Sequence, residues 1–222
     1  MKTIILRSNL KAGLDAVGRA VGLNTNLPVL GNVLIRAEGN NIKLSTTNLE
    51  LAMTKTIAGK VIEPGSTTIP YNTLASVINN ITTERVNLEA KGDNLVIKTD
   101  NYKANIQGLD EKEFPIIPKI GAKKEYLEIG GETLKEALGK VVVAAEVSDL
   151  RPEIGGVLFL VEPSVVKLVA TDSFRLAEGT ISGGEVRNTF TQGLKVTIPL
   201  KTAQELIRVI DEKEKVRFYT DE

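Results

Sequence analysis

The sequence contains no cysteine, no histidine and no tryptophan. Without cysteine the chain has no disulfide and no thiol nucleophile. Without either cysteine or histidine it has no Cys/His metal site and no Ser-His or Cys-His catalytic pair. Carboxylate metal sites and catalysis by lysine or a carboxylate survive this exclusion. Aromatic residues make up only 4% of the chain, so its cores must be built from Val, Ile, Leu and Ala.

The sequence also has no excess of positive or negative charge, because Lys+Arg and Asp+Glu each number 28. A protein that holds DNA by bulk electrostatics is usually basic, so a role on nucleic acid would depend on a local surface or on topology. The first apolar run is only Ile4, Ile5 and Leu6, too short for a signal peptide or a membrane span. We therefore expect a soluble, cytoplasmic protein, as the absence of cysteine also suggests.

The chain of 222 residues has an ordinary globular composition and repeats itself. Three patterns recur at one shared offset of 124 residues, whereas chance matches would scatter over many offsets. The paired segments are Leu10-Lys11 with Leu134-Lys135, Pro28-x-x-Gly31-x-Val33-Leu34 with Pro152-x-x-Gly155-x-Val157-Leu158, and Lys43-Leu44-x-x-Thr47-Asn48 with Lys167-Leu168-x-x-Thr171-Asp172. We predict two related domains, residues 1–120 and 121–222.

Further along, the offset grows, since Ile69-Pro70 corresponds to Ile198-Pro199. An insertion in the Gly-rich stretch Ser182-Gly183-Gly184 explains the change, because loops tolerate added length. The first unit continues through two further strand-like runs that the second lacks. We expect from this comparison that the sequence is a truncated form, with about two strands of the second unit missing.

Hydrophobic periodicity predicts the same elements in each unit. In the first, a strand at residues 2–7 precedes a helix from an N-cap at Ser8 to Val21. Strand-like runs joined by a turn at Gly39-Asn40, a helix after Pro70 and three further strand-like runs follow. In the second unit, helices are predicted at 133–146 and 201–211. The fold class is α+β, with two helices packed on an antiparallel sheet in each domain.

The segment Thr171-Asp172-Ser173-Phe174-Arg175-Leu176 is the most distinctive candidate for chemistry. An enzyme could use Asp172 as a base and Arg175 as an anion clamp. A strand end followed by a hairpin turn explains the same residues without catalysis. The second interpretation is favoured, because no convergent carboxylate pair or metal motif accompanies the segment. No glycine stretch has the spacing of a phosphate-binding loop, and no cofactor is expected.

Basic residues lie on the outward faces of the predicted helices, at Lys11, Arg19, Lys135, Lys140, Lys201 and Arg208. Acidic residues lie among them, so on composition alone an ordinary solvated surface explains the pattern better than a DNA-binding face does. A mixed surface of this kind would hold DNA weakly, through phosphates only and without sequence preference.

Several motifs resemble the bacterial sliding clamp, the DNA polymerase III beta subunit. They cover the chain in order: residues 27–34 (LPVLGNVL), 46–50 (TTNLE), Phe114-Pro115, 151–157 (RPEIGGV) and 170–177 (ATDSFRLA). The first three resemble the first domain of that family, and the last two its second. The resemblance implies three copies of one fold per subunit, and two subunits closed head to tail around duplex DNA with the helices lining the hole.

In that family the ring tethers DNA polymerase III, is placed on DNA by a clamp loader, and binds other proteins through a short peptide motif. The second domain's share of the peptide pocket maps onto Ile154, Thr171, Phe174, Arg175 and Leu176. The resemblance also implies DNA-facing helices with the six basic residues named above, and a subunit interface near Thr73, Leu74, Tyr102, Lys103 and Ile106.

Two departures from the family pattern matter. The loop after the first helix offers only Asn24 where the family often has a basic residue facing DNA. A third domain is absent from the sequence, so we expect a monomer rather than the head-to-tail homodimer of a full-length clamp. The main alternative function is a stand-alone peptide-binding scaffold module with the same fold, and a carboxylate-dependent enzyme is the third.

Overall fold

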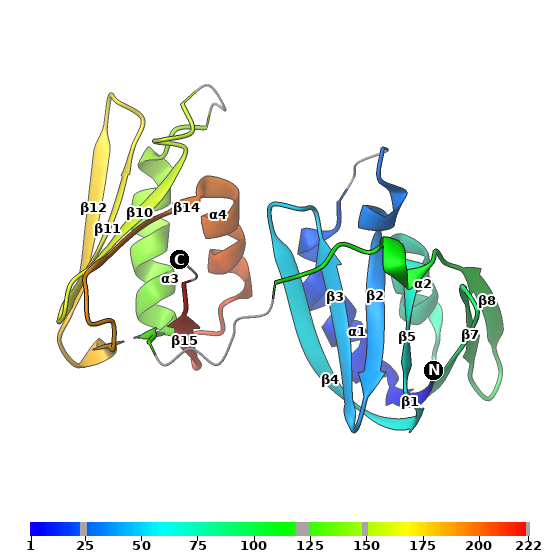
Figure 1. The fold of residues 1–222 in the computed structure, drawn as a ribbon. Coiled ribbons are helices and arrows are strands. Elements are labelled where there is room, and N and C mark those ends of the chain that lie inside the picture. The colour runs from blue at the N-terminus through cyan, green and yellow to red at the C-terminus, as the bar shows by residue number, and fades with distance from the viewer. Residues whose placement is uncertain (23–25, 119–124, 148–150, 221–222) are drawn as a thin grey trace. The chain divides into compact units, whose positions relative to one another are not determined.

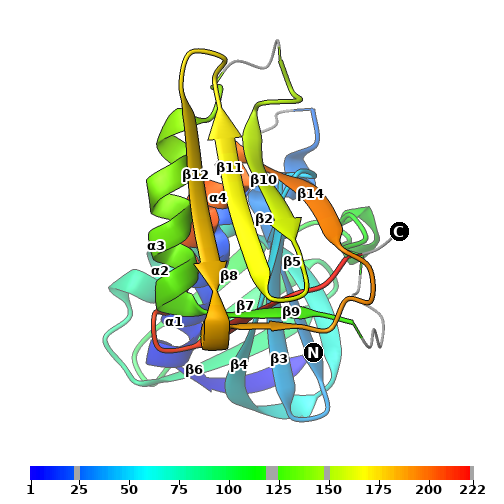
Figure 2. The same ribbon diagram turned by 90° about the vertical axis from the view of Figure 1, so that its left-hand side faces the viewer.

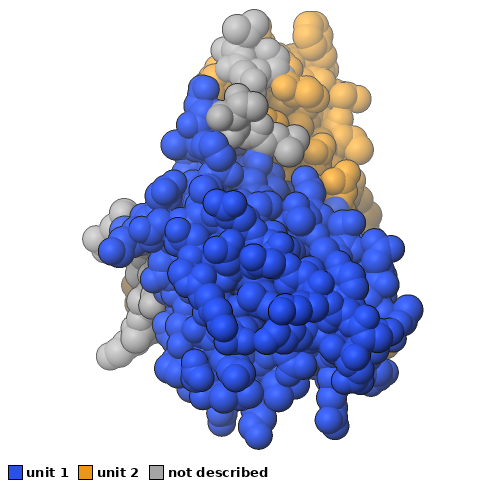
Figure 3. All heavy atoms as spheres, turned by 90° about the vertical axis from the view of Figure 1, so that its right-hand side faces the viewer, with its two compact units in different colours: residues 1–118 blue, residues 119–222 orange. Residues whose placement is uncertain are grey.

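The computed structural model describes residues 1–22, 26–118, 125–147 and 151–220. The chain divides into two compact units, residues 1–118 and residues 119–222 (Figures 1 and 3). Each unit has its own hydrophobic core, made almost entirely of aliphatic side chains.

Unit 1 opens with strand β1 (Lys2–Leu6), which runs directly into helix α1 (Arg7–Val17). The predicted N-cap at Ser8 was wrong: the helix begins at Arg7 with no side-chain cap, and the Arg7 amide donates to the carbonyl of Glu84 at 2.7 Å. The α-helix also ends earlier than predicted, at Val17, because its last turn tightens into the 3₁₀ turn Gly18–Ala20.

The strands of unit 1 form one antiparallel sheet in the order β5-β2-β3-β4-β1-β6-β7-β8. Strand β4 is long enough to pair with β3 on one side and β1 on the other, and so joins the two halves of the sheet. Helices α1 and α2 lie side by side against the sheet (Figure 1). The further elements are β2 (Asn32–Glu38), β3 (Asn41–Thr47), β4 (Ala52–Glu63), β5 (Gly65–Pro70), α2 (Tyr71–Asn80), β6 (Arg85–Lys91), β7 (Asn94–Lys98) and β8 (Lys103–Gln107).

The core of unit 1 lies between this helix pair and the sheet. Leu10, Leu14 and Val17, at helical spacing on α1, are at most 1% exposed, as are Leu74 and Ile78 on α2. Each such side chain contributes roughly 1.5–3 kcal/mol when fully buried. The helices therefore fold against the sheet with their polar faces turned away from it.

Unit 2 has the same plan with two separate sheets, in the orders β12-β11-β10-β14 and β13-β9-β15. Helices α3 and α4 cover one face of the four-stranded sheet (Figure 2). The elements are β9 (Leu127–Gly130), α3 (Gly131–Val141), the 3₁₀ turn Val142–Ala144, β10 (Gly156–Val161), β11 (Val165–Thr171), β12 (Leu176–Ser182), the 3₁₀ turn Gly183–Glu185, β13 (Val186–Asn188), β14 (Leu194–Pro199), α4 (Leu200–Val209) and β15 (Lys215–Phe218).

The duplication found in the sequence extends to the boundaries of the elements. Helices α1 and α3 begin 124 residues apart, at Arg7 and Gly131, whereas α2 and α4 begin 129 residues apart, at Tyr71 and Leu200. Part of the added length falls where the single strand β4 of unit 1 is replaced by β12 and β13, separated by the turn Gly183–Glu185, and the rest falls between β13 and β14. The predicted α+β fold with two helices per unit is confirmed.

Candidate functional site

The distinctive segment, residues 171–176, forms the tight connection between β11 and β12, which pair at Thr171 and Leu176. The Thr171 hydroxyl donates to the carbonyl of Arg175 at 2.8 Å and accepts from the Ser173 amide at 3.1 Å. Ser173 takes a left-handed backbone conformation with φ of 75°. We call residues 171–176 the partner loop, because it contains four of the five residues predicted for a peptide pocket.

Asp172 is the main polar anchor of the partner loop. Its Oδ1 accepts from the amides of Phe174 and Arg175 at 3.0 and 2.9 Å, and its Oδ2 accepts from Arg175 Nε at 2.8 Å. The backbone amides of Arg175 and Phe174 favour the carboxylate and hold the pKa of Asp172 below its usual value. Asp172 therefore acts as the hydrogen-bond acceptor that shapes the loop.

The loop presents apolar side chains to solvent. Phe174 is 97% exposed and Leu176 is 67% exposed, whereas Ile154, the fifth predicted pocket residue, is partly buried. Arg151 joins the Ile154 segment to the loop, since its Nη1 donates to Ser173 Oγ at 3.0 Å and its carbonyl accepts from the Ile154 amide at 3.2 Å. All five predicted residues thus belong to one hydrogen-bonded region of unit 2.

The ion pair of the loop is local. Arg151 contacts Ser173, whereas Asp172 pairs with Arg175. Arg175 is bound from within the loop, because a partner only three residues away can be reached without ordering a second segment.

The basic residues predicted to face DNA are distributed over three helices and a 3₁₀ turn. On α3, Lys135 pairs with Glu212 at 2.8 Å and Lys140 with Glu136 at 2.6 Å. On α4, Arg208 pairs with Glu205 at 2.6 Å. The remaining three, Lys11, Arg19 and Lys201, are exposed, and Asn24 lies outside the described residues.

The ion pairs explain how a helical face with several cations can be close to neutral. A surface pair at short distance contributes about 0–1 kcal/mol to stability, because both groups remain solvated. Its larger effect is on ligand binding, since a phosphate must compete with the carboxylate for the cation. Helix α2 contributes no charged side chain at all, as its sequence is YNTLASVINN.

The residues predicted for a subunit interface divide into two groups. Thr73, Tyr102 and Lys103 are exposed, and β8 lies at the end of the strand order, where it pairs only with β7 among the strands that the structure describes. Leu74 and Ile106 lie in the core of unit 1, at 0% and 6% exposure. Leu74 points from α2 toward the sheet, and Ile106 pairs with buried Leu95 on β7.

A small hollow of about 130 Å³ lies next to this edge, lined by Val77, Asn80, Ile81, Thr82, Asn101 and Tyr102. It places the exposed ring of Tyr102 beside the C-terminal end of α2. Together, the free edge of β8 and this hollow form a surface suited to a strand and one apolar side chain from another chain.

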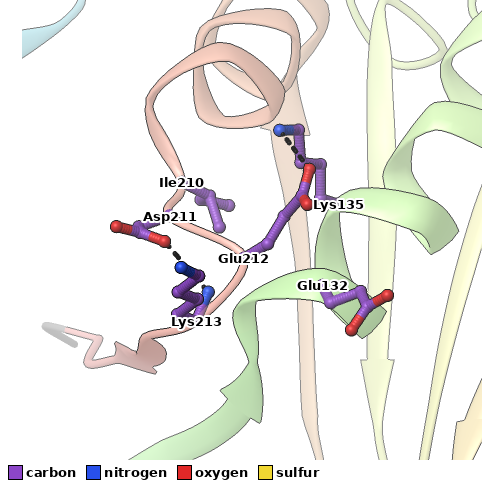
Figure 4. Close-up of a pocket in the computed structure, with 6 residues that line it drawn as sticks. All are labelled: Glu132, Lys135, Ile210, Asp211, Glu212 and Lys213. Atoms are coloured by element: carbon purple, nitrogen blue, oxygen red, sulfur yellow. Dashed lines mark hydrogen bonds and ion pairs between the residues drawn. The ribbon is translucent and has the colours of Figure 1, made fainter.

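A wider, shallow pocket of about 430 Å³ lies at the start of α3, where the turn between α4 and β15 passes over it (Figure 4). Its lining is mostly charged: Glu132, Lys135, Ile210, Asp211, Glu212 and Lys213. The Lys135–Glu212 pair spans the pocket, and the Lys213 amide donates to Asp211 Oδ1 at 2.9 Å. Sequence reasoning missed this pocket because Lys135 and Glu212 are 77 residues apart.

Within the described part of the chain, no three or more Asp or Glu side chains are grouped so that they could hold a metal ion. None of the helices described is long and apolar enough to cross a membrane.

Comparison with known proteins gives matches over most of the chain. Residues 1–118 match the family described as DNA polymerase III beta subunit, N-terminal domain, and residues 128–221 match its central domain. The beta sliding clamp of Proteus mirabilis is 28% identical over 213 residues, which cover 95% of this chain and 57% of that protein. The chain therefore spans a little over half the length of such a relative.

Solved structures show the same fold. The DNA polymerase sliding clamp of Bacillus subtilis matches 100% of this chain and 60% of its own, with a TM-score of 0.93 and 24% identity. The Helicobacter pylori beta clamp bound to a DNA ligase peptide matches 100% of this chain and 62% of its own, with a TM-score of 0.86 and 19% identity.

Proposed function

The chain belongs to the DNA polymerase III beta-subunit family, the bacterial sliding clamps, and from this we propose that it acts as a processivity factor in DNA replication. In this role it has no catalytic activity of its own. As part of a ring around duplex DNA in the cytoplasm, it tethers DNA polymerase III and other proteins to their template.

The observation that carries the proposal is the pair of exposed apolar side chains in the partner loop. Phe174 and Leu176 lie on either side of Arg175, whose guanidinium is held by Asp172 at 2.8 Å. Ordering the loop in advance lowers the entropy lost on binding. Such a surface suits a short peptide with a Leu or Phe anchor, and a relative with the same fold has been solved with a DNA ligase peptide bound.

For DNA, we propose loose contact through phosphates by the basic residues of the helices. Lys11 and Lys201 contribute exposed cations, while Lys135, Lys140 and Arg208 are each balanced by a carboxylate. Arg19 is exposed as well. Asn24 is proposed to face DNA as well. Weak contacts of this kind suit a ring that must slide, because retention then depends on topology rather than on affinity.

For assembly of the whole protein, we propose a head-to-tail homodimer in which the free edge of β8 receives a strand from the other subunit. Thr73, Tyr102 and Lys103 border that edge and are exposed. The clamp loader and the polymerase alpha subunit are proposed partners, by way of the partner loop. The buried pair Leu74 and Ile106 supports the edge from inside the core.

The test is binding of a fluorescent Gln-Leu-Ser-Leu-Phe peptide, measured by anisotropy with the full 222-residue chain. We expect Leu176→Ala to weaken binding by about tenfold or more, since burying one leucine contributes roughly 1.5–3 kcal/mol. Val143→Ala is the control, because Val143 is 62% exposed in the same unit and outside the partner loop. Equal affinity for wild type and Leu176→Ala would rule out the partner loop as the peptide site.

A scaffold module that binds peptides without encircling DNA would also show weaker peptide binding in Leu176→Ala. Retention on DNA separates the two functions. With the complete protein and its loading factor, a clamp stays on closed circular DNA and leaves after linearisation, whereas a scaffold module shows no such difference.

A further inference from the structure

The partner loop of unit 2 has a structural duplicate in unit 1, between β3 and β4. Thr47 Oγ1 accepts from the Leu49 amide at 3.0 Å and donates to the carbonyl of Leu51 at 3.1 Å. Thr171 makes the same two bonds in the partner loop, at 3.1 and 2.8 Å. The two loops therefore present their side chains from the same kind of rigid backbone frame.

The side chains at one equivalent pair of positions differ in chemistry. In unit 2 the pair is Arg151 and Ser173, joined by a hydrogen bond of 3.0 Å. In unit 1, 124 residues earlier, the same positions hold Leu27 and Leu49, which are 45% and 59% exposed. A polar contact in one unit is thus replaced by two solvent-exposed leucines in the other.

Leu30, three residues after Leu27, shares a neighbour with the unit 1 loop. The Gly22 amide donates to the carbonyl of Leu30 at 2.9 Å, and a Cβ at Gly22 would lie 3.5 Å from the Cα of Asn48. The Leu30 amide in turn donates to the carbonyl of Leu27 at 3.0 Å, so Leu27 and Leu49 border the same region around Gly22.

Leu49 is unfavourable for the stability of unit 1 in two ways. Its φ of 77° lies in the left-handed region, which favours glycine, asparagine or aspartate over leucine. Its side chain is also mostly in water, so the strained backbone is not offset by burial in the core. A residue that is unfavourable by both criteria is typical of a position selected for a contact.

The unit 1 loop between β3 and β4 also differs from the partner loop in its charged side chains. Glu50 follows Leu49, is exposed, and makes no ion pair with any side chain in the described ranges. The equivalent residue in unit 2 is Phe174, followed by Arg175. A ligand of the unit 1 loop should therefore have a cation beside its apolar anchor, which the partner loop does not require.

We propose that Leu27 and Leu49 form a second peptide-binding surface, the Leu27–Leu49 surface, in unit 1. It takes an extended segment of a partner protein in which an apolar anchor lies next to a lysine or arginine. The anchor packs between the two leucines, and the cation faces Glu50. This proposal deepens the function given above, because it uses the partner loop as its template.

The test uses the full chain with ¹³C-methyl-labelled leucine, followed by methyl NMR during titration with the peptide Arg-Leu-Ser-Leu-Phe. We expect the Leu27 and Leu49 methyl signals to shift and saturate, separately from those of Leu176. Replacing the peptide's arginine by glutamate should weaken binding at the unit 1 loop about two- to fivefold, as for an exposed ion pair.

Leu49→Asn is the informative variant, because asparagine tolerates the left-handed conformation and so preserves the loop. We expect it to weaken binding at Leu27 about tenfold or more while leaving the shifts of Leu176 unchanged. Leu27 shifts that persist unchanged in Leu49→Asn would overturn the proposal.

The two proposals fail in different ways in this experiment. Silent Leu27 and Leu49 methyls alongside shifting Leu176 methyls would overturn the Leu27–Leu49 surface and leave the partner loop standing. Shifts at Leu27 and Leu49 with a silent Leu176 would support the surface and count against the proposed partner site.

Discussion

Asn48 and Asp172 hold two copies of one hairpin loop in the same way. Asn48 Oδ1 accepts from the amides of the residues two and three positions ahead, at 3.0 and 2.8 Å. Asp172 Oδ1 accepts from the corresponding amides at 3.0 and 2.9 Å. An amide oxygen and a carboxylate oxygen can serve equally as this acceptor, so the negative charge of Asp172 is not needed to shape the loop.

Asp172 can therefore be tested with a matched pair of variants. Asp172→Asn should keep the loop and the peptide affinity close to wild type, because Asn48 makes the same two bonds in unit 1. Asp172→Ala removes both bonds and should weaken peptide binding about tenfold, through the added cost of ordering the loop. Anisotropy titration measures both, and equal losses in the two variants would show that the charge matters after all.

The lowered pKa of Asp172 predicts how pH affects the loop. The stabilisation from its ionised form is fully present above its ordinary value of 3.8 and is lost as pH falls through the lower folded pKa. As the pH falls, the Tm of wild type should therefore decrease relative to that of Asp172→Asn, which has no titratable group at this position. A difference in Tm that stays constant from pH 6 down to pH 2.5 would contradict this.

Gly131, the first residue of α3, should not tolerate a side chain. A Cβ there would lie 2.1 Å from the carbonyl oxygen of Asp211 and 2.7 Å from that of Glu214. We expect Gly131→Ala to destabilise unit 2 by about 1–3 kcal/mol, the usual effect of overpacking. Gly139→Ala, on the same helix with open space around it, should stabilise by about 0.5–1 kcal/mol. Urea unfolding compares the two, and equal effects would contradict the packing described.

The sequence predicted the duplicated fold well, for a physical reason. Inward stripes such as Leu134, Leu138 and Val141 follow helical periodicity, and a shared offset can be seen without any knowledge of packing. The turn at Gly39-Asn40 was also located correctly, between Glu38 and Asn41. These features depend on local sequence, which is why they were accessible.

What could not be predicted depends on contacts between distant residues. The start of α1 is fixed by the bond from the Arg7 amide to Glu84, 77 residues away, rather than by a local cap. Leu74 was predicted near a subunit interface, and only the packing of α2 on the sheet shows that its side chain is buried. The hydrogen bond from Arg151 to Ser173 also links two separate segments, and no local sequence pattern predicts it.

The ion pairs on α3 predict unequal contributions to DNA binding. Lys201→Ala should reduce the slope of log affinity against log salt by about one for nonspecific duplex DNA. Lys140→Ala should have a smaller effect, since Glu136 lies 2.6 Å from its ammonium group and competes with phosphate. Glu136→Ala should tighten binding by freeing Lys140. Fluorescence titrations over a range of salt test the order, and an equal effect of the two lysine variants would contradict it.

The break in unit 2 at the turn Gly183–Glu185 has a consequence for cooperativity. In unit 1 the continuous strand β4 belongs to both halves of the sheet, so neither half can separate without breaking its hydrogen bonds. In unit 2 the same path is interrupted, and Gly183, with φ of 79°, stands at the junction. Amide hydrogen exchange should show unit 1 opening as a single block, whereas β13, β9 and β15 exchange ahead of the four-stranded sheet.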